Sequence, residues 1–438
     1  MKNREIKVFE HETLRVGDEE RGLKPNELKE NEFESLCRFY EETDKRYFSL
    51  ERRKIKLKHY VGVLKVGDLT IEVLPKVGKG QKNDDKKNID KWHDALVKML
   101  KFTQRIRSYS TTESALSTSK QKLLDLYFDQ YMVEVEKLFK EGLRKKYRFK
   151  EGNLSKLKGR IVFSSHIKQN IINKHKTYCK YQTFDFDHDI HSVIKRALLI
   201  TRDITNSSEL NAKAKKILLS FPDEVRDSIS IAKLNKIKLD RTTKRYKKAL
   251  DLASLIIKSC CPVFTAGRVS VLAFMFDMNH LFEEFVFRVI KKGFVGSGVV
   301  VSRRVKKFWD DKEIKPDIVV KGSKGNIVLD TKWKTPLKGI PSDDDLKQIY
   351  VYNNYFESPV SYLLYPEVTA ITRSVIYGGA GRYDKEMFIG NKVVPHYCKI
   401  KMVTFFNSED KLDIPMIEDA LVELIGNEIN PSEAPVEN

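Results

Sequence analysis

The chain has 438 residues, 41% of them hydrophobic, which is enough for two or three domains with cores of their own. Its formal charge of +20 favours contact with polyanions such as nucleic acid, although a merely solvated basic surface would give the same number. The first residues lack the apolar core of a signal peptide, and no run approaches the roughly 18 uncharged residues of a membrane helix, so we expect a cytoplasmic protein without membrane contact. Five cysteines without C-x-x-C spacing argue against a disulfide framework and a zinc site.

Residues 1–145 are predicted to form a β-containing module. Asn31 and Glu34 have the spacing of a capping box and predict the start of a helix. Alternating apolar residues on both sides of Gly67 predict a β-hairpin over residues 60–76, because glycine supplies the positive φ of a tight turn. Nothing in the residues of this hairpin indicates catalysis.

Residues 76–90 are too polar to pack and are predicted to be a flexible loop, and residues 146–265 are predicted to be a helical region. The run from Phe184 to His191 suggests a metal site at first sight. It leads into a helix, however, and acidic residues suit a helix start, so we predict no metal there. Two earlier helices have apolar stripes typical of a core rather than of a base-stacking platform: Trp92, Leu96, Met99 and Leu100, then Leu124, Tyr127, Phe128, Tyr131, Val135 and Leu138.

The clearest candidate site lies between residues 315 and 334. Two β-branched runs flank a turn-rich segment at 322–326 and predict a second hairpin. Side chains alternate along a strand, so Asp330 and Lys332 point to the same side, close to where Asp317 can arrive. Other acidic-x-Lys triplets occur in the chain, but only this one lies inside an apolar strand with a Pro-Asp pair upstream.

Two carboxylates, helped by a backbone carbonyl, can hold Mg²⁺, while a lysine beside them can orient a water and steady a pentavalent phosphate. These are the parts that phosphodiester hydrolysis needs. The alternative interpretation is an ordinary salt-bridged hairpin.

Both flanks of this hairpin are predicted to be helical. Upstream, apolar residues at 278, 281, 282, 285, 286 and 289 have the spacing of a buried helix face, with Glu283 beside it. Downstream, a helix over residues 344–355 places Gln348 and Tyr352 one turn apart on the same side.

The end of the chain completes the predicted mixed sheet with strands at 360–365 and 400–406. The glycines at 378–381 lack the Gly-Lys-Ser/Thr ending of a phosphate-binding loop, and no such loop occurs elsewhere, so we expect this chain to bind no nucleotide. The fold class is therefore α+β or mixed α/β, with residues 266–426 as the last domain and 427–438 as a disordered tail.

The Pro-Asp…Asp-Thr-Lys hairpin resembles the core of PD-(D/E)XK nucleases. Three separated stretches, at 60–76, 276–283 and 317–332, also resemble in the same order the McrC family, the nuclease subunit of the McrBC modification-dependent restriction system. The resemblance implies catalytic or supporting roles for Asp317, Asp330, Lys332, Glu283, Gln348 and Tyr352, and Mg²⁺ ligands at Asp317, Asp330, Thr331 and Glu283.

The same resemblance implies a type IV restriction endodeoxyribonuclease that acts on double-stranded DNA containing modified cytosine. Its partner would be a hexameric AAA+ GTPase of the McrB type, which binds the GTP, and residues 1–265 would dock on it. Two alternatives remain: a stand-alone nuclease in DNA repair or defence, and a non-catalytic activator of an AAA+ motor.

Overall fold

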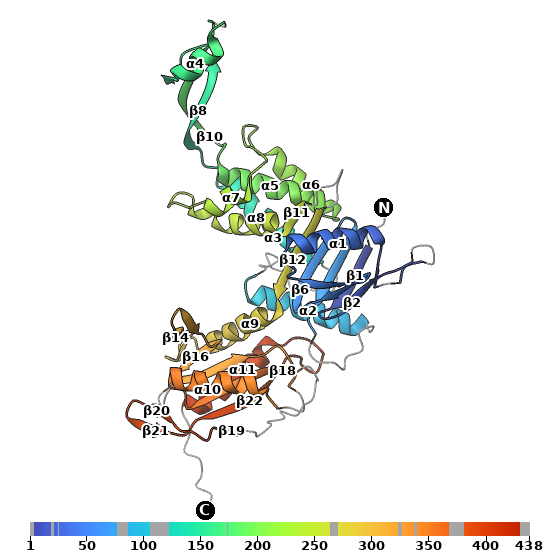
Figure 1. Ribbon diagram of the computed structural model, residues 1–438, viewed down its shortest axis with the longest axis vertical. Coiled ribbons are helices and arrows are strands. Elements are labelled where there is room, and N and C mark those ends of the chain that lie inside the picture. The colour runs from blue at the N-terminus through green and yellow to red at the C-terminus, as the bar shows by residue number, and fades with distance from the viewer. Residues whose placement is uncertain are drawn as a thin grey trace, which may run out of the picture. The chain divides into compact units, whose positions relative to one another are not determined.

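The computed structural model describes residues 4–18, 22–24, 26–76, 86–105, 122–172, 174–262, 270–322, 326–336, 340–367 and 381–429. The chain divides into two compact units, Met1–Gln121 with Val263–Asn438, and Lys122–Pro262, so the first unit contains both ends of the chain (Figure 1). Helices and strands mix in both units, which confirms the predicted class. Among the described residues no helix is long and apolar enough to cross a membrane.

The N-terminal sheet of the first unit runs in the order β1 (Arg4–Phe9), β7 (Leu69–Leu74), β6 (Tyr60–Val66), β12 (Ser270–Asp277). β1 is parallel to β7, and the other pairs are antiparallel. The predicted hairpin over 60–76 is confirmed, with Gly67 at φ 56° in its turn. Gly62 is also required, because a Cβ there would lie 2.0 Å from the Phe274 carbonyl oxygen on β12.

A smaller sheet and two helices belong to the same part. The sheet contains β3 (Glu27–Leu28), β2 (Thr13–Val16), β5 (Lys54–Leu57) and β4 (Phe48–Glu51), and the helices are α1 (Glu30–Glu42) and α2 (Lys86–Phe102). The predicted capping box was wrong: α1 begins earlier, and Glu32 Oε2 accepts the Lys29 N–H at 2.8 Å. The predicted loop was too long, since residues 86–90 are helical; residues 77–85 lie outside the described ranges.

The second sheet of this unit carries the candidate site. Its strands are β13 (Val300–Ser302), β16 (Ile318–Lys321), β17 (Asn326–Thr331), β18 (Val360–Glu367), β22 (Tyr397–Thr404) and β19 (Gly381–Arg382), in this order. β17, β18 and β22 are parallel, while β13, β16 and β19 run antiparallel to their neighbours. Two small hairpins add β14 (Lys306–Trp309) with β15 (Lys312–Ile314), and β20 (Met387–Ile389) with β21 (Lys392–Val394).

Three helices accompany this sheet: α9 (Met278–Gly293), α10 (Asp343–Phe356) and α11 (Ile414–Ile429). The apolar face predicted for α9 is confirmed, because all six of its residues are buried. The stretch before Met278 is strand β12 and not part of that helix. The predicted tail begins too early, since α11 continues to Ile429; residues 430–438 are outside the described ranges.

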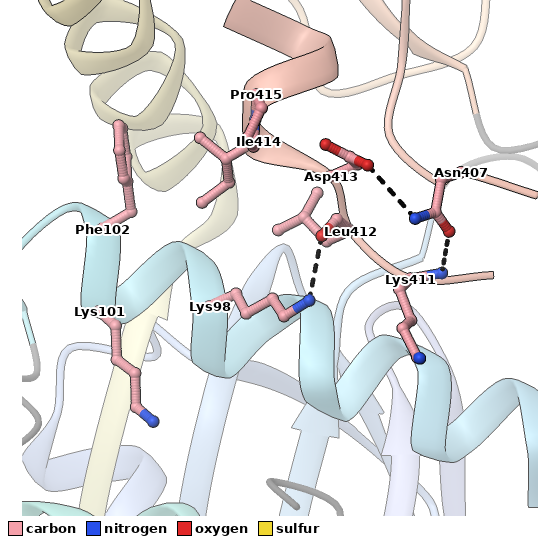
Figure 2. A pocket seen from close by; sticks show the side chains of 9 residues that line it. All are labelled: Lys98, Lys101, Phe102, Asn407, Lys411, Leu412, Asp413, Ile414 and Pro415. Carbon is pink, nitrogen blue, oxygen red and sulfur yellow. Dashed lines mark hydrogen bonds between the residues drawn. The ribbon is translucent and has the colours of Figure 1, made fainter. Parts of the chain in front are cut away.

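Helix α2 joins the N-terminal residues to this second sheet. Trp92 packs edge-on against Phe406 and Trp333, with ring centroids 5.1 and 6.2 Å apart. Lys98 Nζ donates to the Leu412 carbonyl at 3.0 Å (Figure 2). These contacts explain why both ends of the chain form one unit, whereas the sequence predicted separate domains at 1–145 and 266–426.

The second unit combines helices with a projecting arm. Its helices are α3 (Leu123–Lys140), α5 (Asp189–Ile204), α6 (Ser208–Leu219), α7 (Ile231–Lys236) and α8 (Lys247–Ser259), which is followed by β11 (Cys260–Pro262). The predicted core face of α3 is confirmed as buried. The arm was not predicted: β8 (Lys146–Leu154), β10 (Thr177–Asp185) and β9 (Arg160–Ile161) form a sheet, with α4 (Phe163–Asn170) at its far end (Figure 1).

Candidate active site

The hairpin of β16 and β17 brings the predicted carboxylates together. Ile318 pairs with Leu329, and continuing this antiparallel register places Asp317 opposite Asp330, on the same face of the sheet. Asp317 Oδ2 accepts hydrogen bonds from the Thr331 N–H at 2.7 Å and from Thr331 Oγ1 at 2.6 Å. The strand that carries Asp330 therefore also fixes the orientation of Asp317.

Lys332 is held between the sheet and α10. Its Nζ lies 2.7 Å from Asp330 Oδ2 and donates to Gln348 Oε1 at 2.8 Å. Gln348 Nε2 in turn donates to the Tyr352 hydroxyl at 2.7 Å, and that hydroxyl donates to the Lys315 carbonyl at 3.2 Å. The structure thus brings Gln348 and Tyr352 into one chain of hydrogen bonds with the predicted lysine.

The Asp330 carboxylate is short of compensating charge. Its residue is only 2% exposed, and burial, together with the charge of Asp317, raises its pKa to about 7. Oδ2 makes the ion pair with Lys332 but accepts no well-aligned hydrogen bond from the described residues. Burial acts to lower the pKa of Lys332, but the charge and hydrogen bond of Asp330, together with the charges of Asp345 and Asp317, outweigh it, so the net shift is upward and the ammonium stays protonated.

Glu283 and two residues that sequence reasoning missed complete the surroundings. Burial and the charge of Asp317 raise the pKa of Glu283, whose Oε1 is bound by Arg303 at 3.0 Å. Asp345 Oδ2 lies 2.6 Å from Lys334, and its Oδ1 lies 3.8 Å from Lys332 Nζ. The triplet of aspartates that opens α10 was the available signal for Asp345; Arg303 had none beyond its charge.

A sequence model described as "McrBC 5-methylcytosine restriction system component" matches residues 55–366. The chain belongs to this family. No curated protein matches it. A solved structure titled as a refined half-complex from a tetradecameric assembly of Thermococcus gammatolerans McrB AAA+ hexamers with bound McrC is similar, with 17% identity and a TM-score of 0.63, over 96% of this chain and 100% of that one.

A second structure, the cryo-EM structure of the Thermococcus gammatolerans McrBC complex, has 16% identity and a TM-score of 0.45, over 66% of this chain and 88% of that one. The resemblance stated from the sequence is therefore confirmed for the McrBC family, and the similarity of fold extends over nearly the whole chain. The individual site residues stay predictions.

The donor set of this McrBC-family chain suits a hard divalent cation, although its described side chains do not form a complete set of ligands. Within the described residues, no three His, Cys, Asp or Glu side chains are grouped closely enough to hold a metal ion. Asp317 and Asp330 are a carboxylate pair of which only Asp330 is ion-paired with Lys332, and Mg²⁺ is commonly held by one or two carboxylates and several waters. Glu283 would have to leave Arg303 to join them.

A separate cavity of about 610 Å³ lies between α2 and residues 407–415 (Figure 2). Its lining residues are Lys98, Lys101, Phe102, Asn407, Lys411, Leu412, Asp413, Ile414 and Pro415. None of them belongs to the carboxylate site. The cavity adds nothing to the predicted chemistry.

Proposed function

We propose that this chain is the Mg²⁺-dependent endonuclease subunit of a McrBC-type, modification-dependent restriction complex. One observation carries the proposal: inside the region matched by the family, Asp317 and Asp330 lie opposite each other, and Lys332 is poised 2.7 Å from Asp330. A pair of carboxylates with a charged lysine is the minimal set for metal-assisted phosphodiester hydrolysis.

Each residue then has a defined task. Asp317 and Asp330, with the Thr331 carbonyl, would hold the ion, which supplies Lewis-acid activation of the scissile phosphate and of a water. Lys332 places its positive charge beside that phosphate, and Gln348 keeps the ammonium from folding away from the site. Burial and the charge of Asp330 raise the pKa of Tyr352 to about 12, so its hydroxyl stays protonated and can brace Gln348.

The partner and the substrate follow from the relatives. Because the similar assembly contains McrB AAA+ hexamers with bound McrC, we propose a hexameric AAA+ GTPase as the partner, with GTP hydrolysis stimulated by this chain. The substrate is double-stranded DNA with modified cytosine, which the partner reads and this chain cuts in the cytoplasm. The charge of +20 suits phosphate contacts, which carry no sequence information.

The hairpin of β14 and β15 is a candidate DNA contact beside the site. Trp309 is 71% exposed, and the neighbouring Lys306 and Lys307 are exposed as well. β15, the second strand of this hairpin, ends three residues before Asp317 in the sequence. Exposed aromatic and cationic side chains so close to a carboxylate site favour a duplex held there by its backbone.

Reconstitution with the AAA+ partner tests the proposal. Methylated plasmid, Mg²⁺ and GTP should give cleavage with the wild-type chain and none with Asp330→Ala, while both chains raise GTP turnover equally. Equal cleavage by both chains would place the chemistry elsewhere. Stimulated GTP turnover with no cleavage by either chain would favour a non-catalytic activator.

A further inference from the structure

Glu10 connects the N-terminal sheet to the residue that follows Lys332. It directly follows β1 and is fully buried, and its main-chain N–H donates to the Leu74 carbonyl at 2.9 Å. Its Oε1 accepts two hydrogen bonds, from Trp333 Nε1 at 2.7 Å and from the Lys76 N–H at 2.8 Å. One carboxylate oxygen thus holds two segments more than 250 residues apart in the sequence.

This arrangement is costly. Glu10 Oε2 is buried and accepts no hydrogen bond from any residue that the structure describes, although His11 Nε2 lies 3.7 Å away. Burial raises the pKa of Glu10 to about 7, against the smaller opposing effects of its two donors. A glutamine could accept the same two bonds with no charge to bury, so packing alone does not account for the acid.

Trp333 is next to Lys332 in the sequence and packs against the residue before Glu283, so a shift of its backbone would displace residues of the candidate site. Its ring packs against Phe282 and Phe405, with centroids 5.2 and 5.9 Å away, and Phe282 immediately precedes Glu283. In the main chain next to Trp333, the Lys332 N–H donates to the Leu364 carbonyl at 2.9 Å, and the Lys334 N–H donates to the Lys332 carbonyl at 2.9 Å. The indole therefore anchors a tight turn that begins at the predicted lysine.

We propose that Glu10 and Trp333 are positioning residues, through which the N-terminal sheet sets the geometry of Lys332 against Asp330. The inference rests on the proposed nuclease function and adds to it a route by which a partner docked on the N-terminal sheet controls cleavage. Misplacing a reacting group by about 1 Å can cost on the order of 100-fold in rate, so a hydrogen bond that fixes this turn is enough to gate the chemistry.

The chain offers a matched control for the hydrogen bond between Glu10 and Trp333. Glu72 on β7 is also a buried glutamate of the N-terminal sheet, but its ion pairs are with His93 at 2.5 Å and Lys7 at 3.4 Å. Glu72→Ala therefore removes a buried carboxylate from the same sheet without touching the turn at Lys332. Trp333→Phe keeps an aromatic ring in the cluster but removes the Nε1 donor together with one ring of the indole.

The experiment measures the cleavage rate at saturating methylated plasmid, and GTP turnover, in the complex of the full chain with its AAA+ partner. Glu10→Ala and Trp333→Phe should lower the cleavage rate about 10- to 100-fold with KM for DNA and GTP turnover unchanged. Glu10→Gln, which keeps the acceptor, should stay within about threefold of wild type, as should Glu72→Ala per folded complex.

Wild-type cleavage by both Glu10→Ala and Trp333→Phe would overturn the inference. So would an equal loss in Glu72→Ala, because the effect would then be one of general stability. If wild type and Asp330→Ala cleave alike, the proposed function itself fails, and the inference fails with it. That outcome is distinguishable, because in the first two cases Asp330→Ala is still inactive.

Discussion

In the described part of the chain, two acidic clusters at strand ends differ in how far neighbouring cations compensate their charge. In the second unit, Asp185 Oδ2 lies 2.9 Å from Lys150 Nζ, and its Oδ1 lies 3.1 Å from Arg148 Nε. Burial alone would raise the pKa of Asp185, but the hydrogen bond from Lys150 and the charge of Arg148 lower it to about 2. Asp187 is held similarly, 2.6 Å from Arg148 and 2.8 Å from Arg226.

Among the described residues of the first unit, Asp330 has a single ion pair, with Lys332, which also lies 3.8 Å from Asp345. Burial and the charge of Asp317 raise the pKa of Asp330 to about 7. A fully compensated cluster has no electrostatic need for another cation, whereas an under-compensated pair gains from one. Counting carboxylates in the sequence does not separate the two clusters. The number of cations that the fold brings to each of them does.

The largest expected effect tests this difference directly. Asp317→Ala and Asp330→Ala should each lower Mg²⁺-dependent cleavage by about 1000-fold or more, because each removes a predicted metal ligand. Asp185→Asn should keep cleavage within about fivefold, since it removes only a compensated ion pair. Cleavage of methylated plasmid in the reconstituted complex measures both, and a comparable loss in Asp185→Asn would break the comparison.

The comparison can be sharpened with the two buried glutamates of the N-terminal sheet. The pKa of Glu10 is raised from 4.5 to about 7, so its contribution to stability is complete below pH 4.5 and is lost as pH rises to 7. Glu10→Gln should therefore be more stable than wild type above pH 7, by up to about 3 kcal/mol, and the difference should vanish near pH 4.5. Urea unfolding of the full chain across this range measures it.

Glu72 should behave in the opposite way. Burial raises its pKa, but the hydrogen bonds and charges of His93 and Lys7 together outweigh burial, and the net shift is downward. Its contribution to stability is present above pH 4.5 and is lost as pH falls below it, so Glu72→Gln should be less stable than wild type at neutral pH. A stabilising Glu72→Gln would contradict this assignment of compensated and uncompensated carboxylates.

Local patterns were enough to predict the site hairpin and its two flanking helices. Register and helical periodicity depend on neighbours in sequence, so Asp317, Asp330 and Lys332 could be placed together without the fold. Contacts between distant segments could not be predicted. Nothing in the alternation of β1 indicates that Glu10 meets Trp333, 323 residues away.

The arm of β8, β9 and β10 was not predicted for a different reason. Aromatic side chains on β8 and β10, such as Tyr147 and Phe184, are exposed, so the hydrophobic pattern did not mark a buried face of a sheet. The domain boundaries were also predicted wrongly, because they depend on contacts between segments that are distant in the sequence. Strand β12, which pairs with β6 in the N-terminal sheet, follows residue 262, so the N-terminal module is not complete within residues 1–145.

The supporting residues should show intermediate effects. Gln348→Ala frees the Lys332 ammonium from its acceptor, and Tyr352→Phe removes the hydroxyl that braces Gln348. We expect losses of about 10- to 100-fold for the first and less for the second, with KM for DNA unchanged, because neither is a predicted metal ligand. A Tyr352→Phe defect larger than that of Gln348→Ala would reverse the proposed order of support.

The smallest effect concerns the surfaces next to the two clusters. Trp309 on the β14–β15 hairpin and Phe149 on the arm are matched, since they are 71% and 69% exposed and both have lysine neighbours. If DNA lies over the under-compensated carboxylates, Trp309→Ala should weaken binding of the isolated chain to a duplex about threefold to tenfold, and Phe149→Ala should not.

Lys307→Ala should reduce the slope of log affinity against log salt concentration by about 1. Fluorescence anisotropy with an unmethylated duplex at several salt concentrations measures all three variants. A larger loss in Phe149→Ala would move the DNA contact to the arm. The shortage of cations around Asp317 and Asp330 would then no longer indicate where DNA is bound.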